Sequence, residues 1–159
     1  MAYLGIDPGK SGALALIGRD GLTLDWIGLN ETEHDVAKFI ELYRPMIDLA
    51  VLERVGARPG NGAASMFKFG QSYGFCIGLL TAAKIRYQIH TPTKWQRALG
   101  LVRPKLSRTE KKKINKSMAQ RLFMGSPKIT NRNADAFLLA EYARRIEHGG
   151  ENGKAKLAP

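Results

Sequence analysis

The sequence predicts an α/β domain around a mixed sheet of five strands, three antiparallel and then two parallel, with helices on both faces. Three apolar segments joined by turn signals open the chain, which is typical of an antiparallel meander. A helical pattern then separates the third segment from a fourth, so the fourth strand should pair in parallel. The length of 159 residues suits one domain with a sizeable core.

The first strand ends in an acidic residue. Residues 2–7, 12–18 and 22–28 are the three predicted strands, and Asp7 stands between the first apolar run and a Pro-Gly turn. A buried carboxylate is costly unless it has a partner. Asp7 alone is therefore compatible with two interpretations, a functional carboxylate or a turn residue that caps its own loop.

The fourth strand repeats this arrangement. A helix begins at Thr32, where Asp35 completes a helix-capping pattern, and residues 48–53 follow as an apolar run without alternation. Such a run is typical of a central strand that is covered on both faces. Glu53 closes this strand as a second carboxylate, and the glycine-rich residues 55–63 are predicted to form a loop directly after it.

A long helix is predicted over residues 64–84. Gly70, Gly74 and Gly78 stand four residues apart, so they share one face of this helix. Glycine inside a helix costs about 1 kcal/mol relative to alanine, and a smooth glycine face indicates close packing. The partner is either the sheet or the same helix of a second subunit, of which the subunit contact is favoured.

Two basic helices follow a short fifth strand over residues 85–90. Thr91-Pro92 is a helix start and places Lys94 in the first turn. Ser107 and Glu110 form a second capping pattern, after a linker over residues 101–107, and open a helix that reaches about Phe123. Three lysines lie in its first turns, where the helix dipole disfavours positive charge: Lys111, Lys112 and Lys113. A phosphate partner would offset that cost, although the lysines are also compatible with a plain solvated face.

The last helix is predicted from about Asn131 to Ile146. Counted from Asp135, the apolar residues of this helix stand at helical spacing, at Leu138, Leu139, Tyr142 and Ile146. This stripe must face the sheet, so Asp135 is a third carboxylate directed toward the core, with Asn131 on the same face. We therefore expect a domain over residues 1–147 and a flexible polar tail over residues 148–159.

The formal net charge of +11 is concentrated in one part of the chain. Residues 1–90 hold nine basic and nine acidic residues, whereas residues 91–159 hold sixteen basic and five acidic ones. Such asymmetry indicates a polyanionic partner, nucleic acid before a membrane surface, or else a solvated basic face. The single cysteine, Cys76, excludes an internal disulfide and a Cys-based zinc site and fits a reducing, cytoplasmic compartment. We expect no membrane span and no signal peptide.

Three carboxylates are expected at one edge of the sheet. Like charges this close cannot all stay ionised without a cation. A set of oxygen ligands without Cys or His suits Mg²⁺ or Mn²⁺ and suits zinc poorly. Together with the basic region, Asp7, Glu53 and Asp135 therefore predict phosphodiester hydrolysis with two metal ions.

Five segments carry a resemblance to a known family. They are Leu4-Gly5-Ile6-Asp7-Pro8-Gly9, Leu52-Glu53, Phe69-Gly70-Gln71-Ser72-Tyr73-Gly74, Thr91-Pro92-Thr93-Lys94-Trp95 and Asn133-Ala134-Asp135-Ala136. With this set of motifs the chain resembles RuvC-type Holliday junction resolvases, and among them the phage-type branch. The resemblance runs from residue 3 to about residue 145.

The resemblance implies a fold, an activity and a site. The fold would be RNase H-like, and the activity a Mg²⁺-dependent, paired nicking of a four-way DNA junction by a homodimer formed through helix 64–84. Mn²⁺ should substitute for Mg²⁺, and a phage-encoded enzyme would act in the host cell cytoplasm. Asp7, Glu53, Asp135 and Lys94 would be catalytic, and the three acids with Asn131 would bind the metal. The predicted DNA contacts are Lys10, Ser11, Arg58, Asn61, Lys111, Lys112, Lys113 and Lys116.

Two departures from the family pattern leave alternatives open. The family has a further acidic or histidine ligand three or four residues before the last acid, where this chain has Arg132 and Asn131. The chain would then use Asn131, be less active, or be an inactive junction-binding protein. The loop after Glu53 also lacks an aromatic residue before Phe67. Further alternatives are a nuclease for another branched or flapped substrate and an actin- or sugar-kinase-like ATP-binding domain.

Overall fold

The computed structural model describes residues 1–9, 11–54, 56, 62–103, 105–125 and 128–149. Five strands form the sheet, β1 (Ala2–Asp7), β2 (Ala13–Gly18), β3 (Thr23–Gly28), β4 (Ile47–Glu53) and β5 (Tyr87–His90). The helices are α1 (Glu33–Tyr43), the short 3₁₀ turn η1 (Arg44–Met46), α2 (Ala63–Ala82), α3 (Pro92–Ala98), α4 (Arg108–Leu122) and α5 (Ala134–Gly149).

The sheet has the predicted mixed topology. Its strand order is β3-β2-β1-β4-β5, in which β1, β2 and β3 are antiparallel neighbours and β4 is parallel to both β1 and β5. The crossover through α1 explains the parallel pairing, because it returns the chain to the edge of the sheet at which β1 begins, so that β4 runs in the same direction as β1. The C-terminal ends of β1, β4 and β5 therefore lie at one edge of the sheet.

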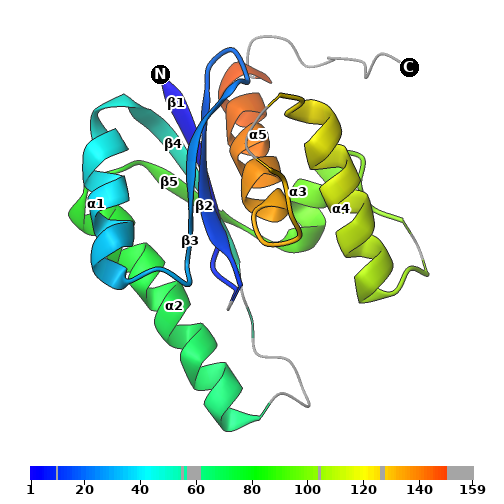
Figure 1. The fold of residues 1–159 in the computed structure, drawn as a ribbon, viewed down its shortest axis with the longest axis horizontal. Coiled ribbons are helices and arrows are strands. Elements are labelled where there is room, and N and C mark those ends of the chain that lie inside the picture. Colours follow the sequence, from blue (N-terminus) through cyan, green and yellow to red (C-terminus); the bar gives the residue numbers. More distant parts are fainter. Residues whose placement is uncertain (10, 55, 57–61, 104, 126–127, 150–159) are drawn as a thin grey trace.

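Side-chain alternation divides the core into two layers. On β1, Leu4 and Ile6 pack with α1 and α2, whereas Tyr3 packs on the opposite face with α3, α4 and α5. Figure 1 shows these two groups of helices on either side of the sheet. The predicted helices on both faces are thus confirmed.

Helix α5 lies closest to the sheet because Gly5 has no side chain. A Cβ atom at Gly5 would overlap the backbone of Ala136 and Ala140. Nine residues of α5 are buried, which is more than an amphipathic surface helix buries. The contact between β1 and α5 fixes where the first turn of α5 stands relative to the end of β1.

Two local predictions need correction. Helix α5 begins at Ala134, because Asn131 lies in a turn and the Asn133 amide oxygen accepts a hydrogen bond from the Thr130 backbone N–H (2.8 Å). The helix also continues through His148, which the sequence assigned to the tail and whose ring nitrogen pairs with the Tyr3 hydroxyl at 2.8 Å. Residues 150–159 of that tail lie outside the described residues.

The helix starts were predicted with mixed success. The side chains of Thr32 and Ser107 cap α1 and α4 as expected, and Ser107 forms a complete capping box with Glu110. Thr91 stands at the start of α3, but its side chain makes no capping hydrogen bond. Pro92 has the fixed φ of a first helical residue and needs no hydrogen-bond acceptor, which favours a helix start at this point.

Candidate active site

Asp7 and Glu53 end two neighbouring parallel strands at the same level. In the register of β1 and β4, Ile6 pairs with Leu52, and each acid is the next residue of its strand. Alternation continues from Gly5 to Asp7 and from Val51 to Glu53, so both acids lie on the α5 face of the sheet. This placement agrees with the sequence expectation.

Helix α5 brings Asp135 to Asp7. Burial raises the pKa of Asp7 to about 6 from an ordinary value of 3.8, and the charge of Asp135 is the next largest cause. The two carboxylates therefore repel each other, although they come from opposite ends of the chain. The close approach of α5 over Gly5 is what makes this meeting possible.

The backbone around Asp7 is shaped by the turn that follows. The Gly9 backbone N–H donates to Asp7 Oδ1 at 3.0 Å, which stabilises the ionised carboxylate. The Gly12 N–H donates to the Gly9 carbonyl oxygen at 2.8 Å and closes the turn. Asp7 thus makes the local turn contact that the sequence allowed, and it also faces a second carboxylate.

Asp135 is held by a residue that the sequence did not single out. Asn115 on α4 is 4% exposed, and its Nδ2 donates to Asp135 Oδ1 at 2.8 Å. Burial raises the pKa of Asp135, while the Asn115 hydrogen bond and the charge of Lys112 lower it. The sequence offered only a weak signal, a polar residue four positions before Ala119 and therefore on the same helical face as an apolar one.

Glu53 has a different partner. The indole Nε1 of Trp95, a fully buried residue of α3, donates to Glu53 Oε2 at 2.9 Å. The Lys94-Trp95 segment therefore reaches the site through its tryptophan. Lys94 itself is exposed, and its positive charge lowers the pKa of the nearby His90 after the larger effect of burial.

The side chains at this edge fit a hard divalent cation in their chemistry. Asp7 and Asp135 offer oxygen ligands from two elements, and a cation between them would relieve their mutual repulsion. Within the described part of the chain, however, no three His, Cys, Asp or Glu side chains stand close enough to hold one metal ion. The expected three-acid cluster is therefore not formed as these side chains lie: Asp7 and Asp135 interact through their charges, while Glu53 stands on the same edge and is directed to Trp95.

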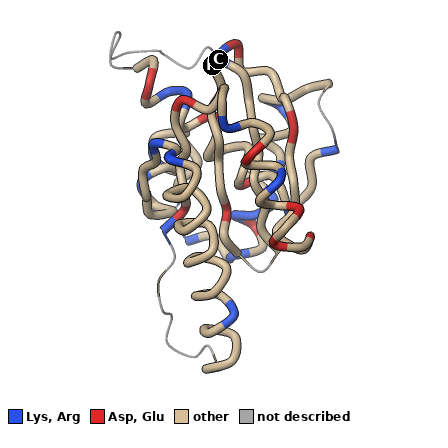
Figure 2. Tube along the Cα trace, turned by 90° about the vertical axis from the view of Figure 1, so that its left-hand side faces the viewer, with Lys and Arg blue, Asp and Glu red and all other residues tan. Residues whose placement is uncertain are grey.

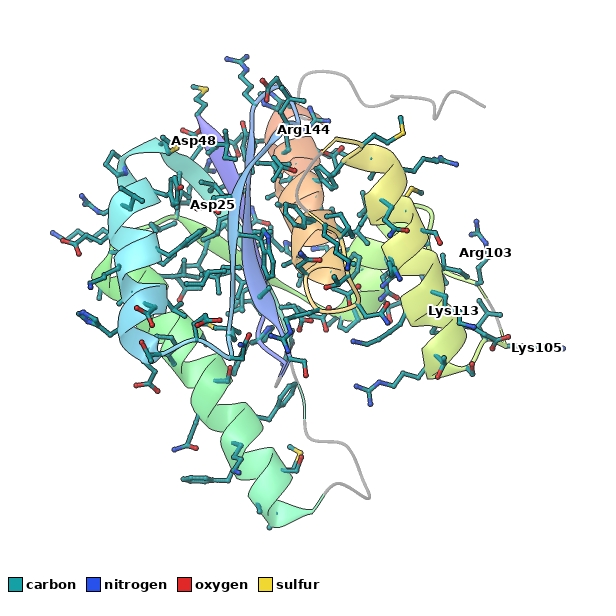
Figure 3. All side chains as sticks on the ribbon, viewed as in Figure 1. Asp25, Asp48, Arg103, Lys105, Lys113 and Arg144 are labelled. Carbon is teal, nitrogen blue, oxygen red and sulfur yellow. The ribbon has the colours of Figure 1, made fainter. Side chains whose placement is uncertain are left out.

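Helix α4 supplies positive charge at the acid pair. The charges of Lys112 and, more weakly, Arg108 lower the pKa of Asp7, so these two residues of α4 face the site. Lys111 and Lys113 are exposed, while Lys116 is half-buried. Figure 3 shows Lys113 on the outer side of α4, away from the sheet. Arg108 was not among the predicted DNA contacts.

The two residues at the positions of the expected further ligand lie in the turn before α5, outside the helix. Asn131 is exposed in the turn before α5, so its expected position on the buried helical face was wrong. The Arg132 guanidinium donates to the side-chain oxygen of Asn30, beyond the end of β3. The role of Asn131 as a metal ligand stays a prediction.

The remaining predicted DNA contacts lie in or near loops. Ser11 is exposed in the turn between β1 and β2. Lys10, Arg58 and Asn61 fall outside the described residues.

The glycine face of α2 is open. A Cβ atom at Gly70, Gly74 or Gly78 would meet nothing within 4 Å, so these glycines do not pack on the sheet. Figure 1 shows the N-terminal half of α2 projecting from the body of the protein, and Phe67 in that half is 68% exposed. Lys68 is its one charged residue, and Figure 2 shows the helix otherwise without charge.

Solved structures share this architecture. Thermus thermophilus RuvC in complex with a Holliday junction substrate aligns with a TM-score of 0.67 and 17% identity, over 94% of this chain and 97% of that one. A second T. thermophilus RuvC structure aligns with a TM-score of 0.62 and 18% identity over the same shares. The chain has the RNase H-like fold of RuvC. No protein-family model and no curated protein sequence matches it.

None of the described helices combines the length and the apolar composition that crossing a membrane requires.

Proposed function

We propose that this chain is a structure-selective endonuclease that resolves four-way DNA junctions by metal-dependent phosphodiester hydrolysis. The observation that carries the proposal is the meeting of Asp7 and Asp135 beneath a basic helix, with Glu53 at the same edge of the sheet. The likeness to a RuvC structure that holds a Holliday junction supports the choice of substrate. Membership of the phage-type branch stays a prediction.

Each side chain has a distinct task in this proposal. Asp7 and Asp135 would hold Mg²⁺ or Mn²⁺, and Glu53 on the neighbouring strand would complete the ligand set by moving closer to them, because the three acids do not stand close enough for one ion as they lie. Trp95 keeps one oxygen of Glu53 occupied, which orients the carboxylate. Two bound Mg²⁺ ions would supply the chemistry here, since one would lower the pKa of the attacking water and the other would stabilise the leaving 3′ oxygen.

The basic residues neutralise the DNA phosphates. Lys112 faces both acids and would contact the phosphate at the cleavage point. Lys111, Lys113 and Lys116 extend the positive surface along α4, and Lys94 extends it from α3. Helix α4 would bind the DNA backbone, because each of its turns carries at least one Lys or Arg side chain.

A second copy of the chain would cover α2. The open glycine face and the exposed Phe67 leave an apolar surface on a helix that projects from the domain. Two such helices can approach closely because glycine has no side chain at the contact. A homodimer would present two sites, which paired nicking of a four-way junction requires.

The first test is nicking of a synthetic four-way junction in Mg²⁺ and, separately, in Mn²⁺. Linear duplex and a flap serve as control substrates. Symmetric paired nicks on the junction alone support the proposal. Nicks on the flap instead point to another branched substrate.

Junction binding without cleavage would favour a different function. Tight junction binding with no nicks in either metal would indicate an inactive junction-binding protein, and Asn131→Asp would then test whether an acid restores cleavage. ATP binding measured by calorimetry tests the kinase-like alternative. Binding of ATP together with no junction binding would overturn the proposal.

A further inference from the structure

We propose that Asn115 is a positioning residue for Asp135, which links the DNA-facing helix α4 to the metal site. This inference rests on the proposed function, because it needs Asp135 to bind a divalent cation. It concerns a residue that neither the motifs nor the charge pattern identifies.

Asn115 is unusual among the buried polar residues. Four such residues occur in the described part of the chain, His90, Asn115, Asn133 and Glu141. Glu141 pairs with arginines of its own helix, and His90 pairs with Gln88 of its own strand. Of these four, Asn115 is the residue that reaches from one helix to a site carboxylate on another.

The cost of burying an amide indicates a specific role. Asn115 is 4% exposed, and its neighbours on the inner face of α4 include the apolar Ile114, Met118 and Ala119. An apolar residue at this position would extend that packing surface. A buried amide is stabilising only when its hydrogen bonds are made, and the Asn115 amide makes its bond from Nδ2 to Asp135.

The geometry of that bond divides the two oxygens of Asp135. Oδ1 accepts the Asn115 N–H at 2.8 Å, which leaves Oδ2 for the cation that Asp135 would share with Asp7. Partners that orient a ligand carboxylate in this way typically change metal affinity by about 10- to 100-fold when they are removed. The fixed orientation also lowers the entropy that the carboxylate loses when it binds an ion.

The same helix carries the phosphate contacts. Lys112 stands three residues before Asn115, and its charge acts on both Asp7 and Asp135. A shift of α4 on DNA binding would therefore move Asn115 together with Lys112. Phosphate binding by Lys112 would thus be coupled to the orientation of Asp135 through Asn115.

The experiment measures Mn²⁺ affinity by calorimetry on the full chain without DNA. Asn115→Ala should bind Mn²⁺ about tenfold more weakly than the wild type. Gln120→Ala is the matched control, because it also removes an amide side chain from α4, one that contacts the Ile129 carbonyl oxygen at 3.4 Å instead of an acid. This control should bind Mn²⁺ as the wild type does.

A second variant guards against loss of folding. Asn115→Leu keeps the branched shape of the side chain, in a somewhat larger volume, without its donor. It should show the same tenfold loss while thermal unfolding verifies the fold. In nicking assays the Mg²⁺ concentration for half-maximal rate should rise in both variants, whereas junction affinity in EDTA stays unchanged. A purely structural contact would lower the melting temperature and leave the metal affinity as it was.

Two results separate failure of this inference from failure of the proposed function. Wild-type Mn²⁺ affinity in a folded Asn115 variant overturns the positioning role alone. Absence of Mn²⁺ binding in the wild type overturns the metal site, and the inference with it.

Discussion

The two faces of the sheet are covered by helices of different character. On one face, α1 and α2 pack through a few buried residues, and α2 extends beyond the domain with an open glycine face. On the other face, α5 is buried along most of its length and lies against the backbone of β1 at Gly5. Glycine therefore has opposite surroundings on the two faces.

Charge follows the same division. The balanced part of the sequence, residues 1–90, contains the whole sheet together with α1 and α2, whereas the basic part contains α3, α4 and α5. The acid pair lies on the face that the basic helices cover. One face therefore carries the candidate chemistry, while the other leaves an open glycine face on α2.

The largest expected effect is on catalysis at the basic face. Asp7→Asn should reduce junction nicking by about 10³-fold, because a bound metal ion contributes several kcal/mol to phosphoryl transfer. Junction affinity in EDTA should stay near the wild-type value, since the lysines of α4 are unchanged. Full nicking activity in this variant would exclude Asp7 as a metal ligand.

The next effect tests the close contact of α5. Gly5→Ala should destabilise the protein by about 3 kcal/mol, because the added methyl group overlaps the backbone of α5, which cannot move aside as a side chain could. Chemical denaturation measures the change. A variant as stable as the wild type would show that α5 shifts freely on β1.

A third prediction concerns stability without metal. The folded-state pKa of Asp7 is raised to about 6 from 3.8, so its ionisation opposes folding as pH rises from about 4 to about 6, and the loss is complete above that range. Asp7→Asn should therefore be more stable than the wild type by about 3 kcal/mol at pH 8 in EDTA. The difference should vanish at pH 4, and an equal difference at both values would contradict the assigned cause.

A fourth prediction separates the basic face from an ordinary solvated surface. Lys112→Ala should lower the salt dependence of junction affinity by about one unit of the log–log slope, because one phosphate contact is lost. Lys38→Ala on α1, on the opposite face, is the matched control and should leave the slope unchanged. Equal slopes in the two variants would remove Lys112 from the DNA interface.

The smallest effect sharpens the contrast between glycines. Gly74→Ala on α2 should stabilise the monomer by about 1 kcal/mol through helix propensity, since the added methyl group meets nothing within 4 Å. The same methyl group should weaken a dimer formed through this face. Light scattering across a range of concentrations measures the dimer, and unchanged dimerisation would place the contact elsewhere.

The main features of the fold follow from local sequence signals. The apolar runs, the turn residues and the helix between the third and fourth strands predict the order and direction of every strand. The register of parallel strands then places Asp7 and Glu53 at one edge, and the apolar stripe of α5 directs Asp135 to the same face. These inferences succeed because each depends on the period of a strand or a helix.

The contacts within the site were decided by packing between distant segments. No pattern in the sequence pairs Asn115 with Asp135 or Trp95 with Glu53. These hydrogen bonds depend on how α3, α4 and α5 pack against the sheet and against one another. The short turn through Asn131 likewise depends on a side-chain hydrogen bond, from the Thr130 N–H to Asn133, which cannot be predicted from the helical spacing of apolar residues.

The sequence by itself therefore determined the sheet, the edge on which the acids stand and the location of the excess charge. Only the tertiary structure decided which acids meet and which neutral donors hold them. It also decided that the glycines of α2 face outward, which the sequence left open. The physical reason is that secondary structure follows from interactions a few residues apart, whereas the direction of a side chain follows from everything that packs around it.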